Sequence, residues 1–581
     1  MRDDSAADSD APQLGFVYEN DAHLEPKWQA PSVEAGPSDG VFGRHVANSE
    51  FLEAWLTCGD WRRLVAMVAN QASADSLKAR FASHPRLAGS ERQLEIVPLP
   101  KFHERFFPSP PVRALHLPQP VDAEFAWVRQ HKGPHSFALS GVTHTISLKE
   151  VMQRFHEMVT APFEAYDTLF CISRASLAVV RAVTDNYAAY LRERFGGAPG
   201  LRMRLEALPF GVDTAKFRPA TPDERLAARS LLGVAPDAIC VLYVGRLSYA
   251  SKVHPFPMYR AVSEAAKRSG TKVHLVLAGW AESPSILQKF QNGAQALGTD
   301  ITTTFVDGMH PRARADVWRA ADVFTSLSDN IQETLGLTIL EAQASGLPVV
   351  TSDWDGCRES VAAGETGYLV PTRMVSGATV DGTSRHLMSE TSYGVFLGET
   401  NQTVCVDVPL TTQAFERLFT DAALRARMGE RGRARVLEQY GWAHVIRQYE
   451  AVWREQERVR REHVALASST GPSAVRTPVA FPDVEFTFGS YPSAILGMDA
   501  QVVASEQASH DLESLLKLPL TSYVASSRVA DQGTLLKLLE LAAAPCGLGE
   551  LEAALTAAGI PRQRCRATLA WLLKYDLLRI V

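Results

Sequence analysis

Two successive series of short apolar runs, each interrupted by helical patterns, are the feature that most constrains how this chain can fold. The first series lies at residues 14–20, 63–69, 94–99 and 112–117, with helix candidates such as 43–59 between its members. The second lies at residues 240–247, 272–279, 302–308, 322–328, 347–353 and 367–372. Runs that are apolar along their whole length and alternate with helices are typical of parallel strands covered on both faces. The sequence therefore predicts the α/β class, with two doubly wound, Rossmann-like domains.

The expected limits of these domains follow from changes in composition. The first α/β domain is expected at 14–212 and the second at 213–440, and residues 208–224 are a polar, proline-marked connection between them. Residues 1–13 are acidic and lack the apolar segment of a signal peptide, so a disordered leader is expected there. After residue 376 the sequence is irregular until Val406, and no element is predicted in that stretch.

A small, mainly α-helical module is expected at the end of the chain, at residues 487–581. A closing helix at 441–467 and a linker at 468–486, rich in Ser, Pro and Gly, precede it. Three short helical patterns and a final apolar segment predict a winged-helix-like unit.

Three arginines of this module, Arg562, Arg564 and Arg566, would contact phosphates if its third helix were a recognition helix. From Gly533 to Val581, however, six basic residues face four acidic ones, a weak excess for a nucleic-acid partner. Docking of a protein partner or self-association is therefore favoured over nucleic-acid binding.

The bulk composition narrows the class of protein. The net charge of -6 provides no general attraction for nucleic acid or anionic lipid. The seven cysteines never form a CxxC pair, which indicates a reducing compartment and argues against a disulfide framework or a zinc site. No apolar run approaches the roughly 20 residues that cross a bilayer. A soluble, cytoplasmic protein is expected.

The stretch "NIQETLGLTILEAQASGLPVVTSDWDG" (330–356) carries the chemistry. It predicts a loop, a helix that begins near Gly336, and a strand, and its two carboxylates, Glu333 and Glu341, enclose seven residues. In doubly wound sheets, ligands bind where strand ends feed helix N-termini, and such a terminus favours an anion. A carboxylate accepts hydrogen bonds from paired sugar or ribose hydroxyls. The alternative is an exposed pair of carboxylates at the ends of a helix.

A positive counterpart lies earlier, in "VLYVGRLSYASK", where a strand ends and Arg246 and Lys252 follow. A diphosphate needs such charge-assisted donors, above all as it leaves. Alone, either residue would be interpreted as a solvated surface charge.

These segments, together with "VDG" (306–308), "LPFGVDTAKFRP" (208–219) and "GCRESVAAGETGYLVPT" (356–372), resemble the donor-binding half of the family-four retaining glycosyltransferases, also called glycosyltransferase group 1. The resemblance extends over roughly residues 14–460 and is strongest at 208–372. It implies the GT-B fold, in which two Rossmann-like domains face each other across a cleft. It also implies transfer of a hexose-type sugar from a nucleotide-diphosphate sugar to an acceptor hydroxyl, without a metal ion or a resident cofactor.

The resemblance implies a role for each matching residue. Glu341 would bind ribose hydroxyls, Glu333 the hydroxyls of the transferred sugar, and Arg246 and Lys252 the leaving diphosphate. His144 in "SGVTHT" matches a histidine beside the donor sugar, and it would serve with Glu333, Arg246 and Lys252 in catalysis. The remaining donor contacts would be Thr334, Leu335, Gly336, Leu337, Val306, Gly40 and Gly43.

Some of these assignments have simpler alternatives. His144 could be a satisfied core or loop histidine, and Gly40 and Gly43 could be turn glycines. Asp353 and Asp355 form a DxD pattern that elsewhere holds a divalent metal, although Arg246 and Lys252 already neutralise the expected diphosphate.

The sequence also departs from the family pattern. Arg246 and Lys252 are one residue further apart than usual, Val253 replaces a glycine, and Thr334 and Leu335 replace Pro-Phe. These departures leave the sugar and the acceptor open: a glycan, a lipid-linked acceptor or a small molecule. Peripheral association with the inner face of the membrane stays open for the same reason. The alternative functions are another GT-B reaction, such as a phosphorylase or epimerase, and a non-catalytic scaffold or sensor that binds sugar nucleotides.

Overall fold

The computed structural model describes residues 14–18, 43–87, 90–107, 109–308, 310–470, 479, 482, 484–523 and 529–581. The chain divides into two compact units, Met1–Pro478 and Val479–Val581. The expected leader at 1–13 and most of the expected linker at 468–486 lie outside the described residues. The division between the units falls within that linker range.

The first sheet has seven strands in the order β3-β2-β1-β4-β5-β6-β7, and every pairing is parallel. The order reverses between β1 and β4, as in a doubly wound fold. The four strands expected from the sequence are present, and three more complete the sheet. The strands are β1 (Leu14–Tyr18), β2 (Arg63–Val68), β3 (Gln93–Pro98), β4 (Ala114–His116), β5 (Ala138–Val142), β6 (Thr168–Cys171) and β7 (Arg204–Ala207).

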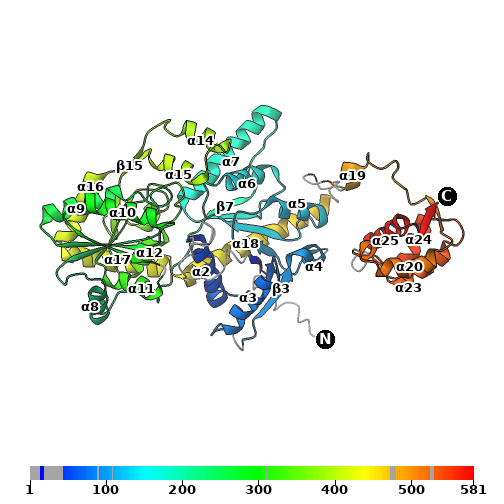
Figure 1. Cartoon of the computed structure of the whole chain (residues 1–581), viewed down its shortest axis with the longest axis horizontal. Coiled ribbons are helices and arrows are strands. Elements are labelled where there is room, and N and C mark those ends of the chain that lie inside the picture. Colours follow the sequence, from blue (N-terminus) through cyan, green and yellow to red (C-terminus); the bar gives the residue numbers. More distant parts are fainter. Residues whose placement is uncertain are drawn as a thin grey trace. The chain divides into compact units, whose positions relative to one another are not determined.

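Helices cover both faces of this sheet, and the expected helix at 43–59 is among them (Figure 1). The helices are α2 (Gly43–Cys58), α3 (Gln71–Ser83), the 3-10 turn η1 (Leu99–Lys101), α4 (Phe102–Phe106), α5 (Ala123–Lys132), α6 (Lys149–Thr160) and α7 (Arg174–Phe195).

The second sheet has six strands in the order β10-β9-β8-β11-β12-β13, again all parallel. Its order reverses between β8 and β11. All six expected strands are present, each within two residues of its expected start. They are β8 (Ile239–Val244), β9 (Val273–Gly279), β10 (Thr302–Asp307), β11 (Val323–Ser326), β12 (Val349–Ser352) and β13 (Gly367–Val370).

The helices of the second domain pack on both faces of its sheet. They are α8 (Pro222–Leu231), α9 (Phe256–Ser269), α10 (Pro284–Leu297), α11 (Pro311–Ala320), α12 (Leu337–Ala344), α13 (Cys357–Ser360), α16 (Val408–Thr420) and α17 (Ala422–Gln439).

The stretch after residue 376, for which no element was predicted, is in fact structured. A two-stranded antiparallel ribbon, β14 (Thr372–Met374) with β15 (Val404–Val406), frames two helices, α14 (Val380–Leu387) and α15 (Tyr393–Asn401). The two helices escaped prediction for different reasons. Helix α14 is only eight residues long and buries none of its side chains. In α15 most of the apolar residues are consecutive, so that it shows no helical period.

The expected closing helix is α18 (Trp442–Thr470), and it packs back onto the first domain. The ring of Trp453 lies 5.1 Å from that of Trp55, and the ring of Tyr449 lies 5.0 Å from that of Phe51. The indole N–H of Trp453 donates to Ser140 Oγ at 3.1 Å. The last helix of the first unit thus completes the core of its first domain.

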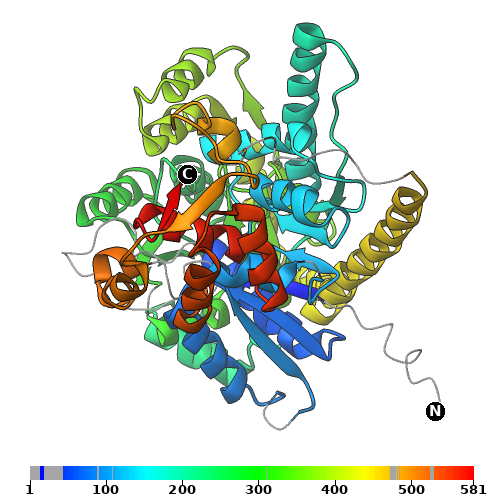
Figure 2. The same cartoon turned by 90° about the vertical axis from the view of Figure 1, so that its right-hand side faces the viewer.

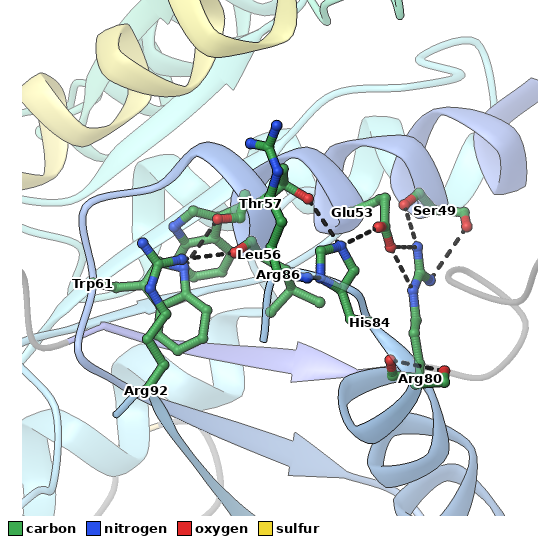
Figure 3. A network of polar contacts seen from close by, with 11 residues as sticks. Ser49, Glu53, Leu56, Thr57, Trp61, Arg80, His84, Arg86 and Arg92 are labelled. Atoms are coloured by element: carbon green, nitrogen blue, oxygen red, sulfur yellow. Dashed lines mark hydrogen bonds and ion pairs between the residues drawn. The ribbon is translucent and has the colours of Figure 1, made fainter. Parts of the chain in front are cut away.

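Polar contacts fix α2 from the side facing α3 (Figure 3). The guanidinium of Arg80 donates to the carbonyl oxygen of Ser49 at 2.8 Å and to the carboxylate of Glu53 at 3.1 Å. His84 Nε2 lies 2.6 Å from the same carboxylate, while its Nδ1 accepts from the backbone N–H of Arg86. This network holds the helix whose first turns carry Val46 and Ala47 to the domain interface.

The second unit has its own core and a three-stranded antiparallel sheet of order β17-β16-β18. The three expected helices and final strand are present, and β16 and α20 add to them. The elements are α19 (Val484–Phe488), β16 (Gln501–Ala504), α20 (Ala508–Lys517), α21 (Pro519–Ser522), α23 (Gln532–Leu541), β17 (Cys546–Gly547), α24 (Leu548–Ala557), α25 (Arg562–Lys574) and β18 (Leu578–Ile580).

The three arginines singled out in this unit make contacts within it. Arg562 and Arg566 both donate to Glu552, and Arg564 donates to the carbonyl oxygen of Val529 at 2.6 Å. Across the described part of the whole chain, no helix is both long and apolar enough to cross a membrane.

Candidate functional site

The candidate site forms where the second sheet reverses its strand order. Strands β8 and β11 are neighbours there, so the loops that leave their carboxyl ends, 245–255 and 327–336, lie side by side. The first loop carries Arg246 and Lys252, and the second carries Glu333. Ligands of doubly wound sheets bind at this position.

A cavity of about 750 Å³ opens at this point between the two domains. The second domain lines it with Arg246, Lys252 and the loop from Glu333 to Thr338. The first domain contributes His144 and Phe210, among others. Two doubly wound domains with a cavity between them are the arrangement expected of the GT-B fold.

Lys252 and Glu333 form an ion pair inside this cavity. The Glu333 side chain is 13% exposed and that of Lys252 is 29% exposed, so the pair is largely withdrawn from water. The other carboxylate oxygen of Glu333 accepts hydrogen bonds from the N–H groups of Gly336, at 3.1 Å, and Thr334, at 3.3 Å. Burial acts to raise the pKa of Glu333, but Lys252 and the two N–H donors outweigh it and hold that pKa below its usual value.

Gly336 connects the loop that carries Glu333 to helix α12. It is the N-cap of α12, with φ at 76°, in the left-handed region that favours glycine. A Cβ atom there would lie 2.9 Å from Ile339 Cδ1 and 3.3 Å from Cys357 Sγ. The glycine thus directs its own N–H at Glu333 and leaves the start of α12 open to a ligand.

Arg246 is the second cation that the β8 loop brings to the cavity. It is ion-paired with Glu282, donates to Gln332 Oε1 at 3.3 Å, and sits 6.0 Å from the centre of the Trp280 ring. Its side chain is 16% exposed. Two cations, each paired with a carboxylate, therefore face the same cavity. Cations in such a position can donate charge-assisted hydrogen bonds to a diphosphate.

The strand ends themselves form the floor of the cavity. Gly279 ends β9 and Gly308 follows β10, and both line the cavity. A Cβ atom on Gly279 would lie 1.9 Å from the carbonyl oxygen of Gly245, so no larger residue fits there.

His144 joins the site from the first domain. It lies just after β5, lines the cavity, and stacks on Phe210 with ring centres 5.3 Å apart and an 18° angle between the planes. Its Nε2–H donates to the carbonyl oxygen of Pro118 at 3.0 Å. Because a carbonyl oxygen can only accept, this bond places a proton on Nε2.

The structure thus brings eight of the predicted residues to one cavity: Arg246, Lys252, Glu333, Thr334, Leu335, Gly336, Leu337 and His144.

Of the four other predicted residues, the three that the structure describes lie outside the cavity lining. Glu341 is 6% exposed and is absent from the cavity lining, although it lies one turn beyond Leu337 on α12. Val306 packs against the second domain's core, and Gly308 takes the expected position at the cavity. Gly43 begins α2, one turn before the lining residues Val46 and Ala47, and Gly40 lies outside the described residues.

The two aspartates of the DxD pattern diverge. Asp353 pairs with Arg358 at 3.0 Å, whereas the carboxylate of Asp355 accepts from the N–H of Gly356. Burial, with the charge of Glu333 beside it, holds the pKa of Asp355 well above its usual value. In the described ranges, no cluster of three or more His, Cys, Asp or Glu side chains is placed to hold a metal ion.

Several cavity residues were not predicted from the sequence. Trp280 and Glu282 follow β9, and Ser392, Tyr393, Val395 and Leu397 come from α15. The end of the β9 run was a usable signal for the first pair, because strand ends converge at this edge of the sheet. No local signal marked α15, which lies about 60 residues beyond Glu333 in the chain.

Comparison with known proteins agrees with this geometry. Residues 227–386 match the model of the family described as glycosyl transferases group 1. D-inositol 3-phosphate glycosyltransferase from Rhodococcus erythropolis (strain PR4) is 33% identical over 195 residues, which are 32% of this chain and 41% of the relative. The enzyme of the same name from Geodermatophilus obscurus is 35% identical over 197 residues, 33% of this chain and 42% of the relative. This chain therefore matches less than half the length of these relatives.

Solved structures resemble the chain over a longer span but only weakly. Anabaena HepE in complex with UDP has 14% sequence identity and a TM-score of 0.47, over 76% of this chain and 100% of that one. Sucrose-phosphate synthase from Thermosynechococcus elongatus has 18% identity and a TM-score of 0.43, over 78% and 99%. Likenesses this weak bear on neither substrate nor mechanism. The family match, to the model of the glycosyl transferases group 1, falls on the domain that carries Arg246, Lys252 and Glu333.

Proposed function

We propose that this chain is a retaining glycosyltransferase that moves a hexose-type sugar from a nucleotide-diphosphate sugar to an acceptor hydroxyl. The observation that carries the proposal is the meeting of Arg246, Lys252 and Glu333 in one cavity, at the N-terminus of α12 and against the first domain. The match to the glycosyl transferases group 1 supports it. Three charged groups of this kind fit the two ends of a sugar joined to a diphosphate.

Each part of the cavity then has a partner in the donor. The diphosphate lies between Arg246 and Lys252, and the free N–H groups at the start of α12 add to its binding. The transferred sugar lies against Glu333 and the backbone of Thr334–Gly336. The nucleoside lies over Gly279 and Gly308, with Trp280 beside its base. Glu341, which lies on α12 one turn beyond the lining residue Leu337, is assigned to the ribose.

In the reaction we propose, the acceptor hydroxyl attacks the anomeric carbon on the face from which the diphosphate leaves. The C–O bond to the diphosphate breaks, the new glycosidic bond forms, and a phosphate oxygen takes the proton of the acceptor. Arg246 and Lys252 stabilise the charge that builds up on the leaving group, and Glu333 and His144 hold the sugar in place. These residues need no metal ion or resident cofactor for such a step.

The acceptor and the place of action are proposed only in outline. Because this chain matches less than half the length of the D-inositol 3-phosphate glycosyltransferases, their acceptor is not carried over. We propose a glycan, lipid-linked or small-molecule acceptor held mainly on the first domain, and action in the cytoplasm or at the inner face of the membrane.

Calorimetric titration with UDP-, GDP- and ADP-sugars, followed by an acceptor screen with the donor that binds, tests the proposal. Binding of one of these donors, transfer with an unchanged anomeric configuration by NMR, and activity in EDTA are the expected results. Absence of binding by all three donors would overturn the proposal. Binding without turnover would instead favour a sugar-nucleotide sensor, and an inverted product would exclude retention.

A further inference from the structure

The segment between β13 and α16 approaches the cavity from a side that neither sheet reaches. We call residues 375–403 the arm; it contains α14 and α15 and rises from the ribbon of β14 and β15. The match to the glycosyl transferases group 1 ends at residue 386, so α15 lies beyond it. Both views of the molecule place the arm beside α6 and α7 of the first domain (Figures 1 and 2).

The base of the arm is fixed to the loop that carries Lys252. Asn401, which is 2% exposed, donates from its side-chain amide to Asp329 Oδ1 at 2.9 Å and to the carbonyl oxygen of Tyr249 at 3.2 Å. A Cβ atom on Gly398 would contact Ala250 at 3.3 Å. The position of α15 is therefore set by the same loops that hold the proposed diphosphate.

The tip of the arm meets the first domain. Tyr393 Oη lies 2.7 Å from Ser147 Oγ, and Lys149 Nζ donates to the carbonyl oxygen of Leu387 at 3.0 Å. Burial raises the pKa of Tyr393, although its bond to Ser147 and the charge of Arg246 act in the opposite direction. The Tyr393 hydroxyl therefore stays protonated at physiological pH. It also lies close enough to Arg246 for the positive charge to act on its pKa.

Between these contacts, the arm forms one wall of the cavity. Ser392, Tyr393, Val395 and Leu397 line it from α15, and Thr145 and Leu148 line it from the loop after β5. All six are uncharged, whereas the diphosphate side of the same cavity carries Arg246, Lys252, Glu282 and Glu333. Hydroxyl groups set among aliphatic and aromatic surface fit a hydroxylated ring, which has polar edges and apolar faces.

We propose that the wall formed by α15 and the loop at 145–148 is an acceptor subsite for a neutral polyhydroxylated compound, and that Tyr393 determines its specificity. The ring of Tyr393 packs against the apolar face of the acceptor. Its hydroxyl exchanges the bond with Ser147 for a bond to an acceptor hydroxyl. This inference rests on the proposed function, since the acceptor has meaning only beside a donor in the same cavity. It differs from an acceptor that carries a phosphate, because none of the six residues that form this wall carries a positive charge.

The test compares wild type, Tyr393→Phe and a matched control, Tyr190→Phe, whose tyrosine is 51% exposed on α7. The full-length proteins are assayed with the donor that binds wild type, and with myo-inositol, methyl α-glucoside, sucrose and D-inositol 3-phosphate as acceptors. We expect transfer to at least one of the three neutral compounds. Loss of one hydrogen bond in Tyr393→Phe should raise the KM for that neutral acceptor by about fivefold or more, because such a bond contributes about 1 kcal/mol. The kcat, the donor affinity and the melting temperature should stay close to wild type, and Tyr190→Phe should change none of them.

Three outcomes would overturn the inference while leaving the proposed function intact. They are donor binding with an unchanged acceptor KM in Tyr393→Phe, preference for D-inositol 3-phosphate, and transfer to none of the neutral compounds. Ser147→Ala tests whether the Tyr393–Ser147 bond serves only to hold the arm against the first domain. In that case Ser147→Ala and Tyr393→Phe should weaken both donor and acceptor binding to the same extent. Equal losses of this kind would also overturn the inference. Failure of wild type to bind any nucleotide sugar would overturn the proposed function, and this inference with it.

Discussion

Lys252 and Glu333 are ion-paired, although 81 residues separate them in the chain and they leave different strands of the second sheet. The pair exists because β8 and β11 are neighbours at the point where the strand order reverses. In the proposed function Lys252 binds the diphosphate of the donor and Glu333 binds its sugar. Donor binding therefore separates the two charged groups, which form an ion pair in this structure.

Glu333→Gln should lower kcat by at least about tenfold with little change in nucleotide affinity, since the loss of one preorganised charge typically costs this much or more. The amide keeps an oxygen for the N–H of Gly336 but loses the negative charge that faces Lys252. Steady-state kinetics and calorimetry measure the two effects, with the exposed Glu365→Gln as control. A kcat equal to that of wild type would remove Glu333 from the proposed site.

Lys252→Met should weaken binding of a nucleoside diphosphate by about tenfold or more while leaving the free nucleoside unaffected, because charge-assisted bonds to phosphate are worth about 1.5–3 kcal/mol. Titration of both ligands into both proteins gives the comparison. Equal losses for the diphosphate and the nucleoside would contradict a phosphate role. Since Met leaves Glu333 buried without its cation, the variant should also melt at a lower temperature, and Glu333→Gln should restore part of that loss in the double variant.

Gly336→Ala should destabilise the protein more than Gly364→Ala, although both glycines have nearly the same left-handed φ, 76° and 78°. The added methyl meets Ile339 and Cys357 at the first position but has nothing within 4 Å at the second. Backbone strain alone costs about 1–2 kcal/mol. Denaturant unfolding should therefore give about that loss for Gly364→Ala and a larger one for Gly336→Ala. Equal losses would mean that α12 shifts to accommodate the methyl.

Asp329→Asn should flatten the pH dependence of stability between about pH 4 and pH 7. Burial raises the pKa of Asp329 to about 7, although the N–H of His254 and the amide of Asn401 donate to it. Its folded-state pKa therefore lies above its unfolded-state pKa, so the folded protein holds the proton more tightly. The stability that Asp329 contributes is complete below about pH 4 and is lost as the pH rises through 7.

The measurement for this prediction is the free energy of unfolding at several pH values. The difference between wild type and Asp329→Asn should change steadily across that interval, in favour of wild type at the acid end. Asp381→Asn on the exposed α14 is the control and should run parallel to wild type. A constant difference between wild type and Asp329→Asn would show that this carboxyl does not change its protonation on folding.

Prediction from sequence worked best where a strand consists mainly of consecutive apolar residues. All six strands of the second sheet carry mostly buried or half-buried residues, and their apolar runs were visible without any tertiary information. In the first sheet, β7 reads RLEA and half-buries each residue, and β5 contains Ser140 and Gly141. Neither strand is a continuous run of aliphatic residues. Strand β7 lies at the edge of the sheet and carries charged residues. In β5, Ser140 accepts a hydrogen bond from Trp453 of α18.

The candidate site divides in the same way. Arg246, Lys252, Glu333 and Gly336 stand at strand ends or helix starts, and the linear pattern of apolar runs locates such points. Tyr393 lies in a segment without periodicity, and only its contact with Ser147 reveals where it points.

The sequence by itself therefore determined the strands of the second parallel sheet, four strands of the first and the loops that carry charge, because these depend on which residues leave water and on the local start and end of each element. The tertiary structure alone decided that Lys252 meets Glu333, that Glu341 is set back from the cavity, and that the arm brings Tyr393 to its wall. Those relationships depend on strand order and on packing between segments distant in the chain, and no local pattern of side chains records which strand lies beside which.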